Sequence, residues 1–414
     1  MKRGYTMKTF VHMSLIVILL CSGIRTDDSL HHEDRDTPQN CHICSLAVAN
    51  ADFGLGLYHA LSSMEDMHGK NLFFSPLSVS RALSMVALGA AAETHDQLFK
   101  ALGFNKTVVN ETVVNSAFMK LFDKFQKDEK ELQLDTGSAI FLKEGFKPND
   151  QFLEDIKHYF ESEGFLIDFS ETEKAKNVIN DYISQKTHGN IENLVNKLDP
   201  SSLMILVNYI YFKGKWEKPF NPKLTHKESF YVDNHTVIQV KMMTRNGKYD
   251  VYEDENLTAV LLPYKGNSTM MIVLPKPEKF KEVEQLLNRD KIGVWIQGME
   301  KTNIHLHVPK FSVSTSYSLK DALKNMGITD LFEGDANLSR ITDKTKLKVS
   351  QFSHKAVLTV DEVGTEASAG SFSEIMPLRK PPVIKVNRPY ILMILQKTTD
   401  QLLFMGKIVN PKEI

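Results

Sequence analysis

The chain has 414 residues, of which 42% are hydrophobic and 24% are charged, and its formal net charge is −1. These are ordinary values for a folded protein with a sizeable core. The near-neutral balance excludes a general electrostatic attraction to nucleic acid or to an anionic membrane, so we expect neither as a partner.

Residues 1–23 have the pattern of a secretory signal peptide. The basic start MKRGYTMK precedes the apolar run FVHMSLIVILL, and small residues follow near Gly23. The run is too short for a comfortable membrane span, and no later segment reaches the roughly 18 uncharged apolar residues that a spanning helix needs. We therefore expect a secreted, extracellular protein of the kind found in plasma.

A polar tail is expected at residues 24–44. The pair His31–His32 lies beside acidic residues and could bind a metal weakly, but a solvated tail is the simpler interpretation. Cys41 and Cys44 are spaced as CHIC, and without a second cysteine pair this spacing favours a local disulfide or two surface thiols over a zinc site. We therefore expect no metal site and no cofactor.

Six N-x-S/T sequons are candidates for glycosylation in a secreted chain. Three of them, Asn105, Asn110 and Asn267, fall in the most polar and turn-like contexts. The full set is Asn105, Asn110, Asn234, Asn256, Asn267 and Asn337.

The helical patterns lie mainly in the first half of the chain. Phe53, Leu57 and Leu61 share one helical face, and Ser75 followed by Pro76 predicts the N-cap and first turn of a buried helix. Further helices are predicted at 93–102, 110–126, 150–163, 172–186 and 316–326.

One of these helices could carry a weak glycosaminoglycan site. Lys120, Lys124 and Lys127 share a face of the helix predicted at 110–126. Asp123, Asp128 and Glu129 lie among them, so an ordinary solvated face is the favoured interpretation.

Strand patterns concentrate in the second half. The segments are short, rich in β-branched or aromatic residues and bounded by breakers: MILVNYIYF, AVLLPY, TMMIVLP, IHLHVPKF, KAVLTVDE, YILMILQ and LLFMGKIV. MILVNYIYF is apolar on both parities, so it should be covered on both faces. TAVLLPYKGNSTMMIVLP predicts a hairpin with a Lys-Gly-Asn turn. The prediction is an α+β fold in one continuous unit, because no flexible linker divides the chain.

No catalytic motif accompanies this fold. A G-x-S-x-G elbow, an H-E-x-x-H helix, a phosphate-binding glycine loop and a dinucleotide fingerprint are all missing from the sequence. Four polar residues do occur in apolar contexts: Ser75, Ser78, Asn208 and His354. A Ser/His hydrolase is one interpretation, but a satisfied buried hydrogen-bond cluster explains them without a substrate, so we expect no enzyme.

The stretch GTEASAGSFSEIMPLRKPP, residues 364–382, is too long for a turn and too poor in large apolar groups for a core strand. If it became a strand, one parity would carry no charge: Thr365, Ala367, Ala369, Ser371, Ser373 and Ile375. Gly364 can relax the backbone at its start, and prolines around Leu378–Arg379 favour an extended shape there. The segment thus combines a potential strand with an exposed dipeptide that a protease could accept.

The chain resembles the serpin family, and specifically its antitrypsin-like secreted members. The similarity runs from about residue 45 to 414 and rests on motifs in family order: NLFFSPLSVSRALSMVALGA, VNYIYFKGKWEKPF, HKAVLTVDEVGTEASAG, VNRPYILMI and LFMGKIVNP. The resemblance implies a single serpin domain at 45–414, with three β-sheets, about nine helices and an exposed reactive-centre loop at 362–382.

The resemblance also implies a function. A serpin is a monomeric suicide inhibitor: a serine protease attacks the loop, forms a covalent 1:1 acyl-enzyme, and is trapped when the loop inserts into the central sheet. Carried over by motif, the cleaved bond joins Leu378 to Arg379. The residues implied at the loop tip are Met376, Pro377, Lys380, Pro381 and Pro382.

Three further groups of residues follow from the same resemblance. The loop hinge is Glu362, Gly364, Thr365, Glu366, Ala367, Ser368, Ala369 and Gly370. The cluster that controls sheet opening is Ser75, Ser78, Asn208 and His354. The region where the loop first enters the sheet is Trp216, Lys310 and Glu362, and Lys310–Glu362 is a predicted salt bridge.

The target is the most open part of the prediction. Leu378 favours proteases with an apolar specificity pocket, such as chymotrypsin-like, cathepsin G-like or elastase-like enzymes. Two alternatives remain: an inhibitor of trypsin-like proteases that uses Arg379, and a hormone carrier that does not inhibit.

Overall fold

The computed structural model describes residues 38–104, 110–128, 132–342, 347–362 and 381–412. Nine α-helices lie in these residues: α2 (Pro38–Ser62), α3 (Pro76–Gly89), α4 (Ala92–Ala101), α5 (Glu111–Asp128), α6 (Asp150–Phe160), α7 (Thr172–Lys186), α8 (Phe280–Gln285), α9 (Arg289–Gln297) and α10 (Lys320–Asn325). Helices and sheets are both abundant, which confirms the α+β class.

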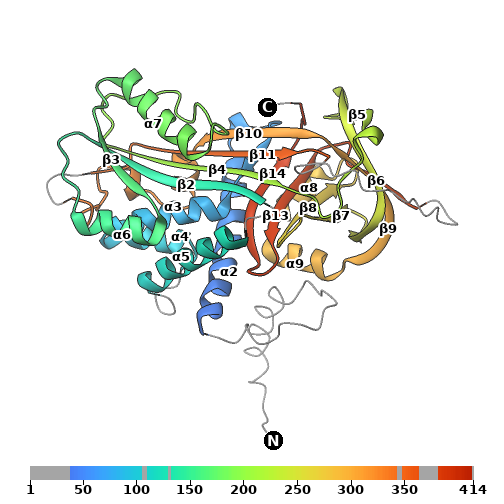
Figure 1. The fold of residues 1–414 in the computed structure, drawn as a ribbon, viewed down its shortest axis with the longest axis horizontal. Helices are drawn as coiled ribbons and strands as arrows, with labels where there is room; N and C mark the ends of the chain where they lie inside the picture. The colour runs from blue at the N-terminus through green and yellow to red at the C-terminus, as the bar shows by residue number, and fades with distance from the viewer. Residues whose placement is uncertain (1–37, 105–109, 129–131, 343–346, 363–380, 413–414) are drawn as a thin grey trace, which may run out of the picture.

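The smaller sheet has five strands in the order β10 (Phe311–Ser318), β11 (Gln351–Val360), β4 (Met204–Gly214), β2 (Leu132–Lys143) and β3 (Glu163–Ile167). It crosses the molecule horizontally in Figure 1, with α7 on one side and α3 to α6 on the other. Ala175, Ile179 and Ile183 of α7 pack in one apolar cluster with strands of this sheet. Because β4 is covered on both faces, ten of its eleven residues are buried, as its uninterrupted apolar sequence predicted.

The larger sheet has nine strands. Its main path runs β1 (Leu72–Phe74), β14 (Gln401–Ile408), β13 (Tyr390–Gln396), β8 (Ser268–Pro275), β7 (Leu257–Pro263), β6 (Val237–Glu253), β9 (Glu300–Pro309) and β12 (Val383–Lys385), and β5 (His226–Tyr231) pairs with β6. The strand β6 is 17 residues long: its first part pairs with β5, its middle with β9 and its last residues with β7. The resemblance implied three sheets. Because β6 is hydrogen-bonded to β5, β7 and β9, two of those sheets are continuous here and form the single nine-stranded sheet.

Local signals placed several elements correctly. α3 begins at Pro76, and the Ser75 side chain accepts a hydrogen bond from the Ser78 N–H, as the Ser-Pro signal predicted. The predicted hairpin is β7 and β8, which pair antiparallel from Leu257↔Pro275 to Pro263↔Thr269.

Other boundaries were wrong. α2 begins at Pro38, inside the expected polar tail 24–44, and carries Cys44 half-buried on its first turns. The helix predicted at 150–163 ends at Phe160, and β3 starts at Glu163. The side chain of Cys41 lies outside the described residues, so the state of the CHIC pair stays a prediction. None of the described helices is both long and apolar enough to span a membrane.

Candidate functional site

The centre of the five-stranded sheet is a parallel pairing of β4 with β11, which we call the β4–β11 seam. It runs in unbroken register from Gln351↔Ile205 to Leu358↔Phe212. The other neighbours of these two strands, β2 and β10, are antiparallel to them. Parallel ladders are slightly less stable per residue than antiparallel ones. The seam is therefore a comparatively weak line through the middle of this sheet.

A buried polar cluster crosses the seam at its midpoint. Asn208 on β4 and His354 on β11 are directly opposite in register, and Asn208 Oδ1 lies 2.6 Å from His354 Nδ1. The same Oδ1 accepts a hydrogen bond of 3.0 Å from Ser78 Oγ on α3. The structure thus brings together the four predicted residues, Ser75, Ser78, Asn208 and His354, which we call the Asn208 cluster.

The Asn208 amide nitrogen reaches in the other direction, toward β2. It lies 2.9 Å from Ser138 Oγ and 3.1 Å from the carbonyl of Gly137. Ser138 was not among the predicted residues, because no strand was predicted there. The sequence offered one signal for this residue: Ser138 is a small polar residue directly after Gly137 and directly before the apolar run that starts at Ala139.

The protonation state of His354 follows from its partners. The Ser75 N–H donates to His354 Nε2 at 3.3 Å, so Nε2 is an acceptor and the proton lies on Nδ1, which donates to Asn208. Complete burial lowers the pKa of His354 to about 3, so the ring is neutral at physiological pH.

This geometry differs from that of a nucleophile and its base. Ser75 Oγ donates at 2.6 Å to the carbonyl of Leu403, and His354 is occupied by a backbone N–H. In a serine hydrolase the imidazole instead accepts the hydroxyl proton. The arrangement therefore supports a structural role for the Asn208 cluster rather than the hydrolase alternative.

A second group of contacts fixes the chain just beyond β11. Trp216 Nε1 donates to the carbonyl of Asp361 at 2.7 Å, and the N–H of Phe220 donates to the carbonyl of Glu362 at 2.8 Å. Lys310 Nζ lies 2.6 Å from Glu362 Oε2, which confirms the predicted salt bridge. Burial alone would raise the pKa of Glu362, but the hydrogen bond from Lys310 and its neighbours outweighs this effect and lowers it. The carboxylate is thus ionised at the point where the predicted loop begins.

Tyr264 supports this group, although it was not among the predicted site residues. Its ring stacks on Trp216 with centroids 4.3 Å apart and an interplanar angle of 9°. Both side chains are almost fully buried. The tyrosine stands at the end of the predicted hairpin strand, and no sequence pattern connects it to a tryptophan 48 positions earlier.

The other end of the loop joins the larger sheet. The N–H of His305 donates to the carbonyl of Pro382 at 2.9 Å, and β12 then pairs in parallel with β9, with Val383 opposite His305. β12 has only three residues, and two of them are exposed. The chain before residue 363 and the chain after residue 380 are therefore attached to different sheets.

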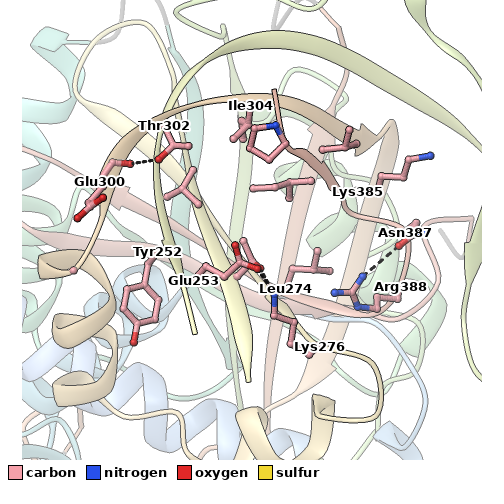
Figure 2. Close-up of a pocket in the computed structure, with 16 residues that line it drawn as sticks. Tyr252, Glu253, Leu274, Lys276, Glu300, Thr302, Ile304, Lys385, Asn387 and Arg388 are labelled. Carbon is pink, nitrogen blue, oxygen red and sulfur yellow. Dashed lines mark hydrogen bonds and ion pairs between the residues drawn. The ribbon is translucent and has the colours of Figure 1, made fainter. Parts of the chain in front are cut away.

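A cleft of about 860 Å³ lies beside this second attachment. Figure 2 shows Lys276 turned toward Glu253, with which it forms an ion pair, and Arg388 near Asn387. Arg388 Nε also donates to the carbonyl of Pro275 at 2.7 Å. These cations are already engaged by neighbouring protein oxygens, so the cleft offers little free charge to an anionic ligand.

Most predicted loop residues lie outside the described part of the chain. The hinge residues after Glu362, the tip residues Met376, Pro377 and Lys380, and the bond Leu378–Arg379 fall within 363–380. Of the sequons, Asn105 also falls outside, Asn110 and Asn234 are exposed, and Asn256, Asn267 and Asn337 are half-buried. Lys120 and Lys124 are exposed on α5, whereas the side chain of Lys127 is not described.

Comparisons with known proteins agree on one family. Residues 48–411 match the family model described as "Serpin (serine protease inhibitor)". The chain is 40% identical over 390 residues to an alpha-1-antiproteinase of Bos taurus, with 94% of this chain and 92% of that protein covered. It is 42% identical over 343 residues to an alpha-1-antitrypsin homolog of Cyprinus carpio, with 82% and 92% covered.

Solved structures give the same picture. Human thyroxine-binding globulin complexed with thyroxine is similar at a TM-score of 0.85 and 36% identity, covering 90% of this chain and 100% of that one. Human glycosylated kallistatin is similar at a TM-score of 0.84 and 37% identity, covering 91% and 100%.

Proposed function

Because the chain belongs to the serpin family, we propose that it is a secreted inhibitor of serine proteases that acts as a suicide substrate. The protease serine attacks the carbonyl carbon of Leu378, the peptide bond to Arg379 breaks, and the new amine takes a proton. The Leu378 acyl group remains as an ester on the serine. Insertion of the released loop into the β4–β11 seam then traps the ester before water can hydrolyse it.

The observation that carries this proposal is the parallel seam itself. A segment that follows β11 and folds back along it runs antiparallel to β11, and also antiparallel to β4. Its insertion replaces one parallel pairing with two antiparallel pairings, which are the more stable kind. The sheet therefore has both a place for the loop and a gain from accepting it.

The Asn208 cluster supports a controlled opening of this seam. Insertion must separate Asn208 from His354, whose side chains lie 2.6 Å apart across it. Both are buried, so an opened seam leaves polar groups unpaired until the new strand arrives. The cluster thereby keeps the seam closed until cleavage supplies a strand.

The small, uncharged parity of residues 365–375 supports insertion of this loop in particular. Alternate side chains of an inserted strand face the helices beneath the sheet, where a charge would be expensive. Leu378 supports a target with an apolar specificity pocket, of the chymotrypsin-like, cathepsin G-like or elastase-like kind.

The test is incubation with chymotrypsin and with trypsin, followed by denaturing gels. We expect an SDS-resistant 1:1 complex with chymotrypsin, with the released fragment starting at Arg379. Thr365→Arg should convert the inhibitor into a cleaved substrate, and Glu366→Arg, on the opposite parity, is the matched control that should still form complex. No stable complex with either protease would refute inhibition, and a complex with trypsin alone, cleaved after Arg379, would assign Arg379 as the reactive residue.

A carrier role is the second candidate, supported by the similarity to thyroxine-binding globulin. Binding of an iodothyronine such as thyroxine should quench the fluorescence of the buried Trp216 or Trp295 in a saturable way. A carrier that forms no protease complex would replace the inhibitor proposal.

The proposal also covers the oligomeric state, the glycans and heparin binding. We infer a monomer, with glycans at the exposed Asn110 and Asn234 before the other described sequons. Lys120 and Lys124 provide a weak site for heparin at most, because Asp123 lies exposed between them. Heparin should then change the rate of complex formation by less than about twofold at physiological salt, where surface charges are screened within ~8 Å.

A further inference from the structure

Two histidines and a glutamate meet on the outer strands of the larger sheet, away from the β4–β11 seam. They are His226 and Glu228 of β5 and His307 of β9, and one ligand atom from each lies within 4.8 Å of the others. Glu228 Oε2 is at the centre, 3.5 Å from His226 Nε2 and 3.1 Å from His307 Nδ1. The proposed inhibition uses none of these side chains.

The position of the proton on His226 is fixed by its other nitrogen. His226 Nδ1 lies 3.0 Å from the backbone carbonyl of Leu224, which can only accept, so Nδ1 carries a proton and donates it. In the neutral ring, Nε2 then carries a lone pair that faces a carboxylate oxygen. Two acceptors face each other, and a cation bound between them would remove their repulsion. A backbone carbonyl on the far nitrogen is also the usual outer partner of a metal-binding histidine.

The two carboxylate oxygens of Glu228 face different partners. Its Oε1 forms an ion pair with Lys385 of β12, and its Oε2 faces the two imidazoles. Oε2 is therefore the carboxylate oxygen that can provide a ligand atom on the side of the two histidines.

The separations suit a small tetrahedral ion. Zinc binds nitrogen at ~2.0–2.1 Å and carboxylate oxygen at ~2.0–2.2 Å, so two ligands of one tetrahedron are roughly 3.4 Å apart. The observed separations of 3.5 Å and 3.1 Å bracket that value. We propose that His226 Nε2, Glu228 Oε2 and His307 Nδ1 form a Zn²⁺ site whose fourth position is taken by water. No metal site was predicted from the sequence; His226 and His307 are 81 positions apart, and only the fold brings them together.

The site has a structural consequence for the reactive loop. His307 is opposite Lys385 in the β9–β12 register, and Lys385 is bound to the same glutamate. Zinc would therefore tie β5 to β9 directly beside the three-residue strand that ends the loop. Bound zinc is expected to raise the thermal midpoint of the intact protein.

Titration of the whole protein with Zn²⁺ by calorimetry tests the site, and Mg²⁺, which prefers oxygen ligands, should not bind there. His226 is exposed, so His226→Ala should leave the circular dichroism spectrum unchanged and weaken zinc binding more than about 100-fold, since loss of even an outer partner costs ~10–100-fold. Glu228→Gln should weaken binding similarly. His235→Ala, at an exposed histidine beyond the end of β5, is the matched control and should bind zinc normally.

The N-terminal histidines and cysteines need their own control, because His31, His32, Cys41, His42 and Cys44 can also bind zinc. A variant with these five positions changed to Ala or Ser should still bind the zinc ion, whereas the His226→Ala variant should not. Replacement of zinc by Co²⁺ gives a visible spectrum that reports four-coordinate geometry, and His226→Ala should abolish it. No zinc binding, or zinc binding lost in the five-position variant and kept in His226→Ala, overturns the proposal. No protease is involved, so the outcome is independent of the inhibition experiment.

Discussion

The β4–β11 seam and the pairing of β13 with β14 both lie inside this molecule, but they differ in strand direction and in the polarity of their middle. Tyr390 to Ile394 of β13 are each 0% exposed, and they pair antiparallel with β14 through an almost wholly apolar interior. The β4–β11 seam is parallel and carries Asn208 and His354 across its middle.

The difference shows how one chain can combine a rigid core with an opening line. Apolar antiparallel strands are stabilised by burial over their whole length, so separating them exposes a large area to water. Across the β4–β11 seam, an inserted strand would replace the ladder hydrogen bonds with its own, so the net cost in hydrogen bonds is small. We therefore expect opening to be confined to the β4–β11 seam.

Cleavage of the loop is the largest expected perturbation of this comparison. An inserted strand adds about ten ladder hydrogen bonds at ~0.5–1.5 kcal/mol each, so the cleaved protein should gain roughly 5–15 kcal/mol. At about 2 °C or more per kcal/mol, the thermal midpoint should rise by at least ~10 °C. Calorimetry before and after nicking within residues 370–380 measures it. An unchanged midpoint would mean that the seam does not accept the loop.

Truncation in the apolar core comes next. Leu392→Ala should reduce the free energy of unfolding by about 2–5 kcal/mol, because Leu392 is 0% exposed and its removal leaves a cavity. Val294→Ala, at a side chain that is 55% exposed on α9, is the control and should change it by less than ~0.5 kcal/mol. Denaturant unfolding compares the two. A small loss at Leu392 would contradict the view that this pairing is the rigid part.

Acid should weaken the seam through His354. Its pKa is about 3 in the folded protein and 6.5 in an unfolded chain, so the unfolded state binds more protons between those values. Stability is then lost as pH falls below about 6.5, by roughly 2 kcal/mol at pH 5. His354→Gln removes this titration, so the difference in unfolding free energy between pH 7.5 and pH 5 should shrink by that amount. An equal pH dependence in both proteins would remove His354 as the cause.

The smallest effect is expected at the start of the loop. Lys310 is 39% exposed, so Lys310→Gln should cost about 1 kcal/mol or less in unfolding free energy. It should nevertheless change the emission of Trp216, which is bonded to the carbonyl of Asp361 beside the ion pair. Lys301→Gln, an exposed lysine on β9, is the matched control and should leave the emission unchanged.

Much of the fold and of the site could be predicted from local chemistry. Ser75–Pro76 set the start of α3, and the doubly apolar run of β4 required cover on both faces. The polar residues Asn208 and His354 stood out because their surroundings were apolar. These signals need only a few neighbouring residues to be recognised.

The missed elements depend on partners far along the chain. β2 contains Gly137, which weakens a strand pattern, yet an added Cβ there would lie 2.4 Å from Tyr209 Oη of the neighbouring strand. The helix predicted at 316–326 was wrong at its start, because β10 continues in register with β11 as far as Ser318↔Ser353, and α10 covers only Lys320–Asn325. Pairing across the sheet overrides local preference in both cases.

The pairing of β1 with β14 sets the order of events during synthesis. Phe74 of β1 is opposite Met405, about 330 residues later in the chain. At ~5–20 residues per second, the ribosome needs roughly 20–60 s to produce that partner. Asn71 likewise waits for the backbone of Val409 and Asn410, to which its side chain bonds. A premature stop that removes only the last dozen residues would therefore leave the earliest strand of the described chain without its neighbour and direct the product to quality control.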